Sequence, residues 1–107
     1  MSQDAVDALS VETIAERVAP VVRDVPAVKR LYLFGSHARG DAQADSDVDF
    51  RAEIDRSCGF GMFDFGRLYG ALKEAVGCAI DLVTADDLGS DAFARSVERD
   101  KVLLYER

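Results

Sequence analysis

The sequence is poor in the features from which structural zinc sites, membrane spans and export signals are built. It has one histidine and two cysteines, and the spacing of Cys58 and Cys78 matches no zinc-binding pattern. No uninterrupted apolar run approaches the roughly 18 residues of a membrane-spanning helix. The first ten residues, MSQDAVDALS, lack the basic and apolar regions of a secretory signal. We therefore expect a cytoplasmic protein without membrane association, whose cysteines are reduced thiols rather than a disulfide or a metal pair.

Positive charge is also scarce, because 13 Lys and Arg face 20 Asp and Glu, for a formal net charge of −7. Proteins that bind nucleic acid regardless of sequence rely on excess Lys and Arg, so we expect no direct nucleic-acid binding. A basic protein partner suits this acidic chain better. The chain has no internal repeat, low-complexity tract or linker, and its 107 residues predict a single domain over 1–107.

Hydrophobic periodicity predicts an alternation of helices and strands. Helical spacing of apolar residues covers about 11–22, 65–76 and 91–99. Strands are predicted at Val28–Phe34, at 47–54 and at 79–84, and the last apolar run, VLLY, is either a strand or a helical end. This order indicates an α/β or α+β protein whose sheet is covered by helices mainly on one face.

Local signals predict where these elements begin and end. Ser10 is placed to cap the first helix and Asp64 the second, which Gly77 should stop. Pro20 should kink or end the first helix near its last turn. Core candidates among the aromatic residues are Phe60, Phe63 and Phe65, and expected helix-capping or surface charges are Asp86, Asp87 and Asp91.

Three acidic residues are predicted to share one face of the sheet. Asp47 and Asp49 alternate with apolar residues on one strand, which places them on the same face roughly 6.6 Å apart. Asp81 occupies the matching face of another predicted strand. If the two strands are neighbours, three carboxylates converge and require a counter-charge, for which Mg²⁺ is the natural ion. The alternative is a solvated face, the commonest use of alternating charge on a strand.

A Gly-Ser turn precedes these acids. Gly35-Ser36 follows an apolar strand and opens a possible helical turn, HARG, where backbone N–H groups can face a phosphate. Ser36 adds a hydroxyl donor, and Arg39 is a candidate cation for the same phosphate chain. The alternatives are a purely structural turn and, for Arg39, a surface salt bridge. His37 is expected to face solvent without a catalytic role, as is Glu53 further along the acidic face.

The spacing of these residues resembles that of a known superfamily. Gly35-Ser36, ten residues, then Asp47-x-Asp49 is similar to the Gly-Ser-x10-Asp-x-Asp motif of the DNA polymerase beta-like nucleotidyltransferases. The segments FGSHARGDAQADSDVDF, AIDLVTADDL and ERDKVLLYE resemble the minimal nucleotidyltransferases of prokaryotes, and the resemblance covers nearly the whole chain from about Val11. It implies a polymerase beta-like palm fold with a small mixed sheet.

The resemblance also implies a role for each motif residue. Gly35 and Ser36 would hold the triphosphate of ATP, and Asp47 and Asp49 would bind Mg²⁺, as two ions. Asp81 would be the third catalytic acid, as a metal ligand and as base or orienter for the attacking hydroxyl.

The function that the resemblance implies is that of an antitoxin. Minimal nucleotidyltransferases are commonly partners of HEPN-domain ribonuclease toxins, to which they transfer AMP from ATP onto a tyrosine. We therefore expect a protein adenylyltransferase in a hetero-oligomer with such a toxin. Two alternatives stay open: nucleotide transfer to a small hydroxylated molecule such as an antibiotic, and a non-catalytic module that neutralises its partner by occlusion.

Overall fold

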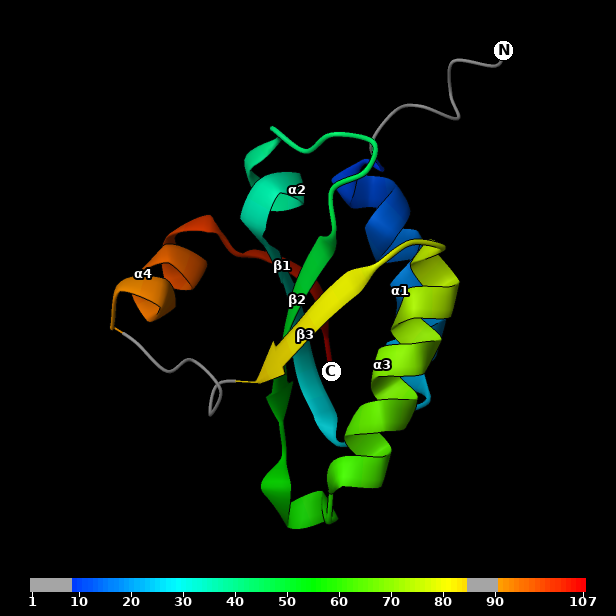
Figure 1. The fold of residues 1–107 in the computed structure, drawn as a ribbon. Coiled ribbons are helices and arrows are strands. Elements are labelled where there is room, and N and C mark those ends of the chain that lie inside the picture. Colours follow the sequence, from blue (N-terminus) through cyan, green and yellow to red (C-terminus); the bar gives the residue numbers. More distant parts are fainter. Residues whose placement is uncertain (1–8, 85–90) are drawn as a thin grey trace.

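The computed structural model of the chain describes residues 9–84 and 91–107 (Figure 1). Predicted helices and strands are present, and the last apolar run is a strand rather than a helical end. In chain order the elements are α1 (Val11–Arg23), β1 (Val28–Phe34), α2 (Gly35–Arg39), β2 (Val48–Ile54), a 3-10 turn (Arg56–Cys58), α3 (Met62–Val76), β3 (Ile80–Thr84), α4 (Asp91–Asp100) and β4 (Val102–Glu106).

The four strands form one mixed sheet in the order β3-β2-β1-β4. β1 runs antiparallel to β2 and to β4, whereas β2 and β3 are parallel. A parallel pair needs a long crossover connection, which α3 supplies between β2 and β3. The predicted fold class, a small mixed sheet with helices, is confirmed.

The main core lies between the sheet and two helices. α1 and α3 run side by side along one face of the sheet (Figure 1). From the sheet, Leu31, Leu33 and Phe50 are fully buried in this layer, and Leu72 of α3 is buried against them. α4 lies on the other side of the sheet (Figure 1). The face that carries the predicted acids is therefore the one opposite α1 and α3.

The helix ends follow the predicted signals with one exception. Ser10 caps α1, since its side chain accepts a hydrogen bond from Thr13 N at 3.1 Å, and Pro20 lies in the last turn. Gly77 ends α3 with φ +79°, a left-handed conformation that glycine tolerates best. Asp64 is not the N-cap. α3 begins earlier, at Met62, and the Asp64 carboxylate accepts a hydrogen bond from Gly61 N at 2.8 Å.

Two side chains at the start of α3 point into solvent. Phe63, predicted as core, is 89% exposed, and its neighbour Met62 is 92% exposed. The prediction for Phe63 was wrong because α3 begins at Met62, before the apolar stripe of about 65–76. Phe63 therefore lies in the first turn of α3 and outside that stripe. Phe60 and Phe65 are partly buried against the core, as expected.

The polar face of β2 is less solvated than its alternation predicts. Arg51 is buried, with its guanidinium 5.5 Å from the centre of the Tyr32 ring and 3.4 Å from Glu98 of α4. Glu53 was expected to be merely solvated, yet its carboxylate accepts a hydrogen bond from Arg30 Nη1 at 2.7 Å. α4 and β1 thus supply partners that the pattern of one strand does not reveal.

Other predictions concern segments and residues away from the sheet. Cys58 and Cys78 are free thiols, as predicted. Asp86 and Asp87 lie outside the described residues. Within 9–84 and 91–107, no helix is long and apolar enough to cross a membrane.

Candidate active site

The parallel pairing of β2 and β3 brings two of the predicted acids together. Asp49 of β2 is the direct cross-strand partner of Asp81 of β3. Asp47 immediately precedes β2, on the approach to the same edge. Asp49 is half-buried, whereas Asp47 and Asp81 are exposed. The strand order on which convergence depended is therefore present.

The electrostatics of Asp49 show that these carboxylates act on one another. Burial, the largest cause, acts together with the charges of Asp81 and Asp47 and a hydrogen bond to Asp81 to raise the pKa of Asp49 to about 6. Among the main causes, only the positive charge of Arg39 opposes this shift. An acid with such neighbours is stabilised in its charged form by a cation.

The donor set fits a hard cation that keeps part of its hydration shell. In the described part of the chain, no group of three or more His, Cys, Asp or Glu side chains stands ready to surround an ion. The arrangement is instead the Asp49–Asp81 pair, with Asp47 within electrostatic reach. Mg²⁺ is bound through one or two carboxylates, with water and phosphate oxygens in its other positions. The residues present therefore fit Mg²⁺, which needs few protein ligands. In the described residues they do not form a cage that surrounds an ion with protein ligands alone.

The Gly-Ser turn packs directly against this pair. Gly35 has φ +77°, and a Cβ added to it would overlap Asp49 Oδ2 and lie 3.1 Å from Asp49 Cγ. Glycine is needed here both for its backbone conformation and for the space that Asp49 occupies. Ser36 follows in the first turn of α2, whose N-cap residue, Phe34, makes no side-chain cap hydrogen bond. The turn and the acids, 14 residues apart in sequence for Gly35 and Asp49, thus form one site.

Arg39, at the end of α2, forms two ion pairs. Its Nε donates to Asp41 at 3.2 Å and its Nη1 donates to Asp100 of α4 at 3.3 Å. The hydrogen bonds to Asp41 and Asp100 raise the pKa of Arg39 above its ordinary value. Its charge also reaches Asp49. The salt-bridge alternative is therefore present in the structure, and contact with a triphosphate stays a prediction.

His37 differs from its prediction. It is 6% exposed rather than solvent-facing, and its Nδ1 lies 3.1 Å from the carbonyl oxygen of Asp47. Hydrophobic periodicity cannot predict the burial of one polar residue in a helix of five residues. The sequence offered only the position of His37, in the turn between an apolar strand and the Asp-x-Asp pair, as a sign of its burial.

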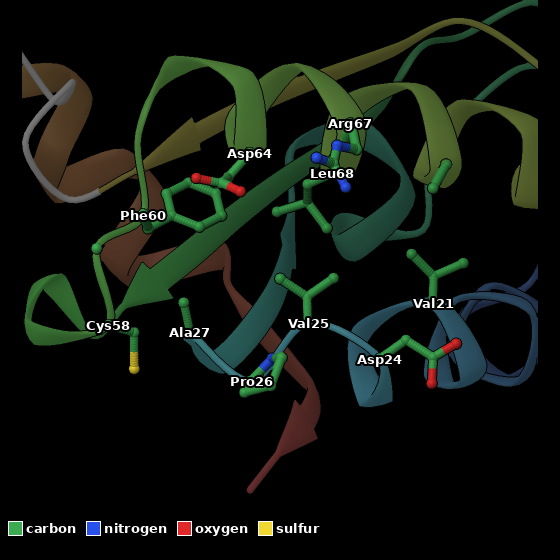
Figure 2. Close-up of a pocket in the computed structure, with 12 residues that line it drawn as sticks. Val21, Asp24, Val25, Pro26, Ala27, Cys58, Phe60, Asp64, Arg67 and Leu68 are labelled. Atoms are coloured by element: carbon green, nitrogen blue, oxygen red, sulfur yellow. The ribbon is translucent and has the colours of Figure 1, made fainter.

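A pocket of about 560 Å³ lies at the other end of the sheet (Figure 2). At this end of the sheet Val28, the first residue of β1, pairs with Ile54, the last residue of β2. The acids lie at the opposite end of the two strands, where Phe34 pairs with Asp49. Figure 2 shows Phe60, Asp64 and Leu68 facing the turn between α1 and β1 across this hollow. The pocket is separate from the candidate active site.

The chain is similar in sequence and in fold to known proteins. Residues 16–107 match the family described as "Polymerase beta, Nucleotidyltransferase". A relative from Thermococcus cleftensis, named protein adenylyltransferase MntA, is 30% identical over 92 residues, which are 86% of this chain and 90% of that protein.

Solved structures share the fold. One described as that of a minimal nucleotidyltransferase has a TM-score of 0.71 and 28% identity, over 88% of this chain and 95% of that one. Another, of the tri-AMPylated Shewanella oneidensis HEPN toxin in complex with MNT antitoxin, contains a chain with a TM-score of 0.66 and 19% identity. That match covers 91% of this chain and 73% of the other, and at this identity it shows the fold alone.

Proposed function

Because this chain belongs to the polymerase beta nucleotidyltransferase family, we propose that it is a Mg²⁺-dependent protein adenylyltransferase that acts as an antitoxin. In this proposal it transfers AMP from ATP to a tyrosine of a HEPN-domain ribonuclease toxin and so neutralises the toxin. The observation that carries the proposal is the contact of Gly35 with Asp49, which in turn is paired with Asp81 across the parallel strands.

The acids would hold the metal. Asp47, Asp49 and Asp81 offer only carboxylate oxygens, the ligands that Mg²⁺ prefers. Two bound ions would stabilise the charge on the attacking and the leaving oxygen. Half-buried Asp49 suits a ligand to both ions, and the exposure of Asp81 leaves it accessible to an incoming acceptor.

The other motif residues would hold the nucleotide. Backbone N–H groups of Gly35 and Ser36, with the Ser36 hydroxyl, would donate to the triphosphate, and Arg39 would exchange a carboxylate partner for a phosphate oxygen. The tyrosine oxygen then forms a bond to the α-phosphorus while the bond from that phosphorus to the bridging oxygen breaks. Pyrophosphate leaves, and the hydroxyl proton passes to Asp81 or, where Asp81 only orients the hydroxyl, to water.

The partner follows from the relatives and from charge. The name of the Thermococcus relative supports a protein as the acceptor of AMP, and we propose a HEPN toxin because a chain of the same fold stands in a complex with an AMPylated HEPN toxin. A net charge of −7 suits docking on a basic, RNA-binding surface in a hetero-oligomer. The free thiols Cys58 and Cys78 suit the reducing cytoplasm. In this proposal residues 1–107 form one catalytic domain.

The test is intact-mass measurement of a co-expressed HEPN toxin after incubation with ATP and Mg²⁺. We expect the toxin to gain one or more AMP units with the wild-type chain and none with Asp47→Asn or Asp49→Asn. Glu53→Gln is the matched control, because it removes an acid from the same face of β2 but one paired with Arg30. Complex formation without added mass would indicate occlusion, and antibiotic resistance from this chain alone would indicate a small-molecule acceptor.

A further inference from the structure

The buried His37 ring connects α2 to the segment that carries the acids. His37 lies next to Ser36 in α2, and its Nδ1 is 3.1 Å from the carbonyl oxygen of Asp47. Residues 40–47 between these points belong to no helix or strand. This contact therefore ties the far end of the loop to α2, the helix that begins with the Gly-Ser turn.

The hydrogen bond has only one possible direction. A carbonyl oxygen has no proton to donate, so Nδ1 of His37 carries the hydrogen and donates it to Asp47. Burial of the ring removes competing water, and a buried donor without its acceptor is costly.

The same peptide group is also held from the other side. Val48 N, which shares the peptide bond with the Asp47 carbonyl, donates to Ala79 O at 3.1 Å. The carbonyl of this peptide is thus held by α2, and its N–H by the residue before β3. Held at both polar atoms, the peptide cannot rotate, although the Asp47 side chain it carries is exposed.

We propose that His37 is a positioning residue, which sets the place of Asp47 relative to the Gly35-Ser36 turn by holding the Asp47–Val48 peptide. The proposal rests on the proposed function, in which Asp47 binds metal and the turn binds the triphosphate. His37 touches neither the metal nor the nucleotide in this role. It fixes the distance between the two groups that must meet them.

Three substitutions separate the donor from the volume of the ring. His37→Asn places an amide N–H at the position of Nδ1, whereas His37→Gln moves the amide one bond further, toward the position of Nε2. His37→Phe keeps a ring of similar size without a donor. A residue needed only to fill the core would be replaced best by Phe, and a positioning donor only by Asn.

Two measurements on the chain alone test the proposal. We expect amide exchange at Val48 to be faster in His37→Phe and His37→Gln than in wild type, and restored in His37→Asn. We also expect the Kd for Mn²⁺, a paramagnetic substitute for Mg²⁺, to rise about tenfold in the His37→Phe and His37→Gln variants and to return to the wild-type value in His37→Asn. If His37→Phe does not fold, the comparison of the His37→Asn variant with the His37→Gln variant decides.

The opposite results overturn the proposal. The ring would only fill space if the His37→Phe and His37→Gln variants kept the wild-type rate of amide exchange and the wild-type Mn²⁺ affinity. The same would follow if the His37→Asn variant failed to restore these two quantities. Exchange is measured without metal, ATP or toxin, so it decides the role of His37 at the peptide even if no AMP transfer is found. Absence of transfer by the wild-type chain would contradict the proposed function alone.

Discussion

At the scale of single residues, the Asp49 carboxylate lies in surroundings that disfavour its charge. Burial, Asp81 and Asp47 raise its pKa from 3.8 to about 6. The folded chain therefore binds this proton more tightly than the unfolded chain, so the free energy of unfolding falls as pH rises from about 4 to about 6. A bound cation would reverse this cost, because it favours the charged form.

Asp49→Asn should consequently stabilise the metal-free protein while it abolishes AMP transfer. In EDTA at pH 7.5 we expect a gain on the order of 1 kcal/mol, reduced from the full effect because solvent screens a half-exposed group. Near pH 4 the two proteins should be equally stable, since Asp49 is then protonated. Thermal unfolding at both pH values measures this. A variant less stable than wild type at pH 7.5 would contradict the proposed repulsion.

Wild-type activity should follow the same ionisation. At subsaturating Mg²⁺, protons compete with the metal for Asp49, so the rate of AMP transfer should fall as pH drops through about 6. Saturating Mg²⁺ should move this decline to lower pH. The rate measured from pH 5 to 8 at two Mg²⁺ concentrations checks this, and a profile that ignores Mg²⁺ would exclude competition at the site.

Gly35→Ala should misplace Asp49. The new Cβ would overlap Asp49 Oδ2, and we expect transfer to fall about 100-fold, the usual cost of a displacement near 1 Å. Gly40→Ala is the matched control, because Gly40 has φ +86° yet nothing within 4 Å of an added Cβ. Both variants should lose about 1 kcal/mol from backbone strain. Equal activity losses would attribute the effect to strain rather than to Asp49.

At the scale of elements, α2 and α4 are joined through Arg39 and Asp100 across a gap of 61 residues. Arg39 is exposed, so its ion pairs contribute little to stability. Arg39→Met should leave the free energy of unfolding essentially unchanged and raise the KM for ATP about tenfold. Asp41→Asn, which removes one carboxylate partner and keeps the cation, should leave the KM low. A tenfold rise in both variants would indicate that the ion pair, not the guanidinium, matters.

Elements with a periodic pattern or a cap could be predicted from the sequence, and isolated contacts could not. The apolar run of β1 and the cap at Ser10 are local properties, so their boundaries were predicted correctly. The burial of His37 and Arg51 depends on partners distant in sequence, Asp47 in the loop before β2 and Glu98 of α4. Such burial has no signature in the neighbouring residues.

At the scale of the whole molecule, strand order decides whether a site exists. The sequence places Asp49 and Asp81 on the same type of face, but 32 positions apart. Only the parallel pairing of β2 with β3, across α3, makes them direct neighbours. The resemblance to nucleotidyltransferases implied that Asp81 joins the other two acids, but it named no strand pairing. The alternation of residues alone left it open.

Arg107, which follows β4, is joined to the C-terminal end of α1 and to the start of β1. Its backbone N–H donates to Lys29 O at 3.0 Å, and its Nε donates to Val28 O at 2.9 Å. Nη2 donates to Val22 O at 2.7 Å and to Val25 O at 3.0 Å, at the C-terminal end of α1. Val22 O and Val25 O also accept backbone N–H groups, from Val25 and Val28, so the guanidinium adds a second, charged donor to each carbonyl and complements the dipole of α1.

Arg107→Ala should therefore destabilise a fold whose active site lies at the other end of β1. Loss of charge-assisted hydrogen bonds to α1 and β1 at once should cost about 2 kcal/mol, measured by chemical denaturation. Arg107→Lys should fall between, because one ammonium cannot reach both elements. Arg99→Ala is the control, since that side chain is 72% exposed and pairs only locally, and it should cost less than about 0.5 kcal/mol. Equal stability of the two alanine variants would show that Arg107 does not hold α1 to the sheet.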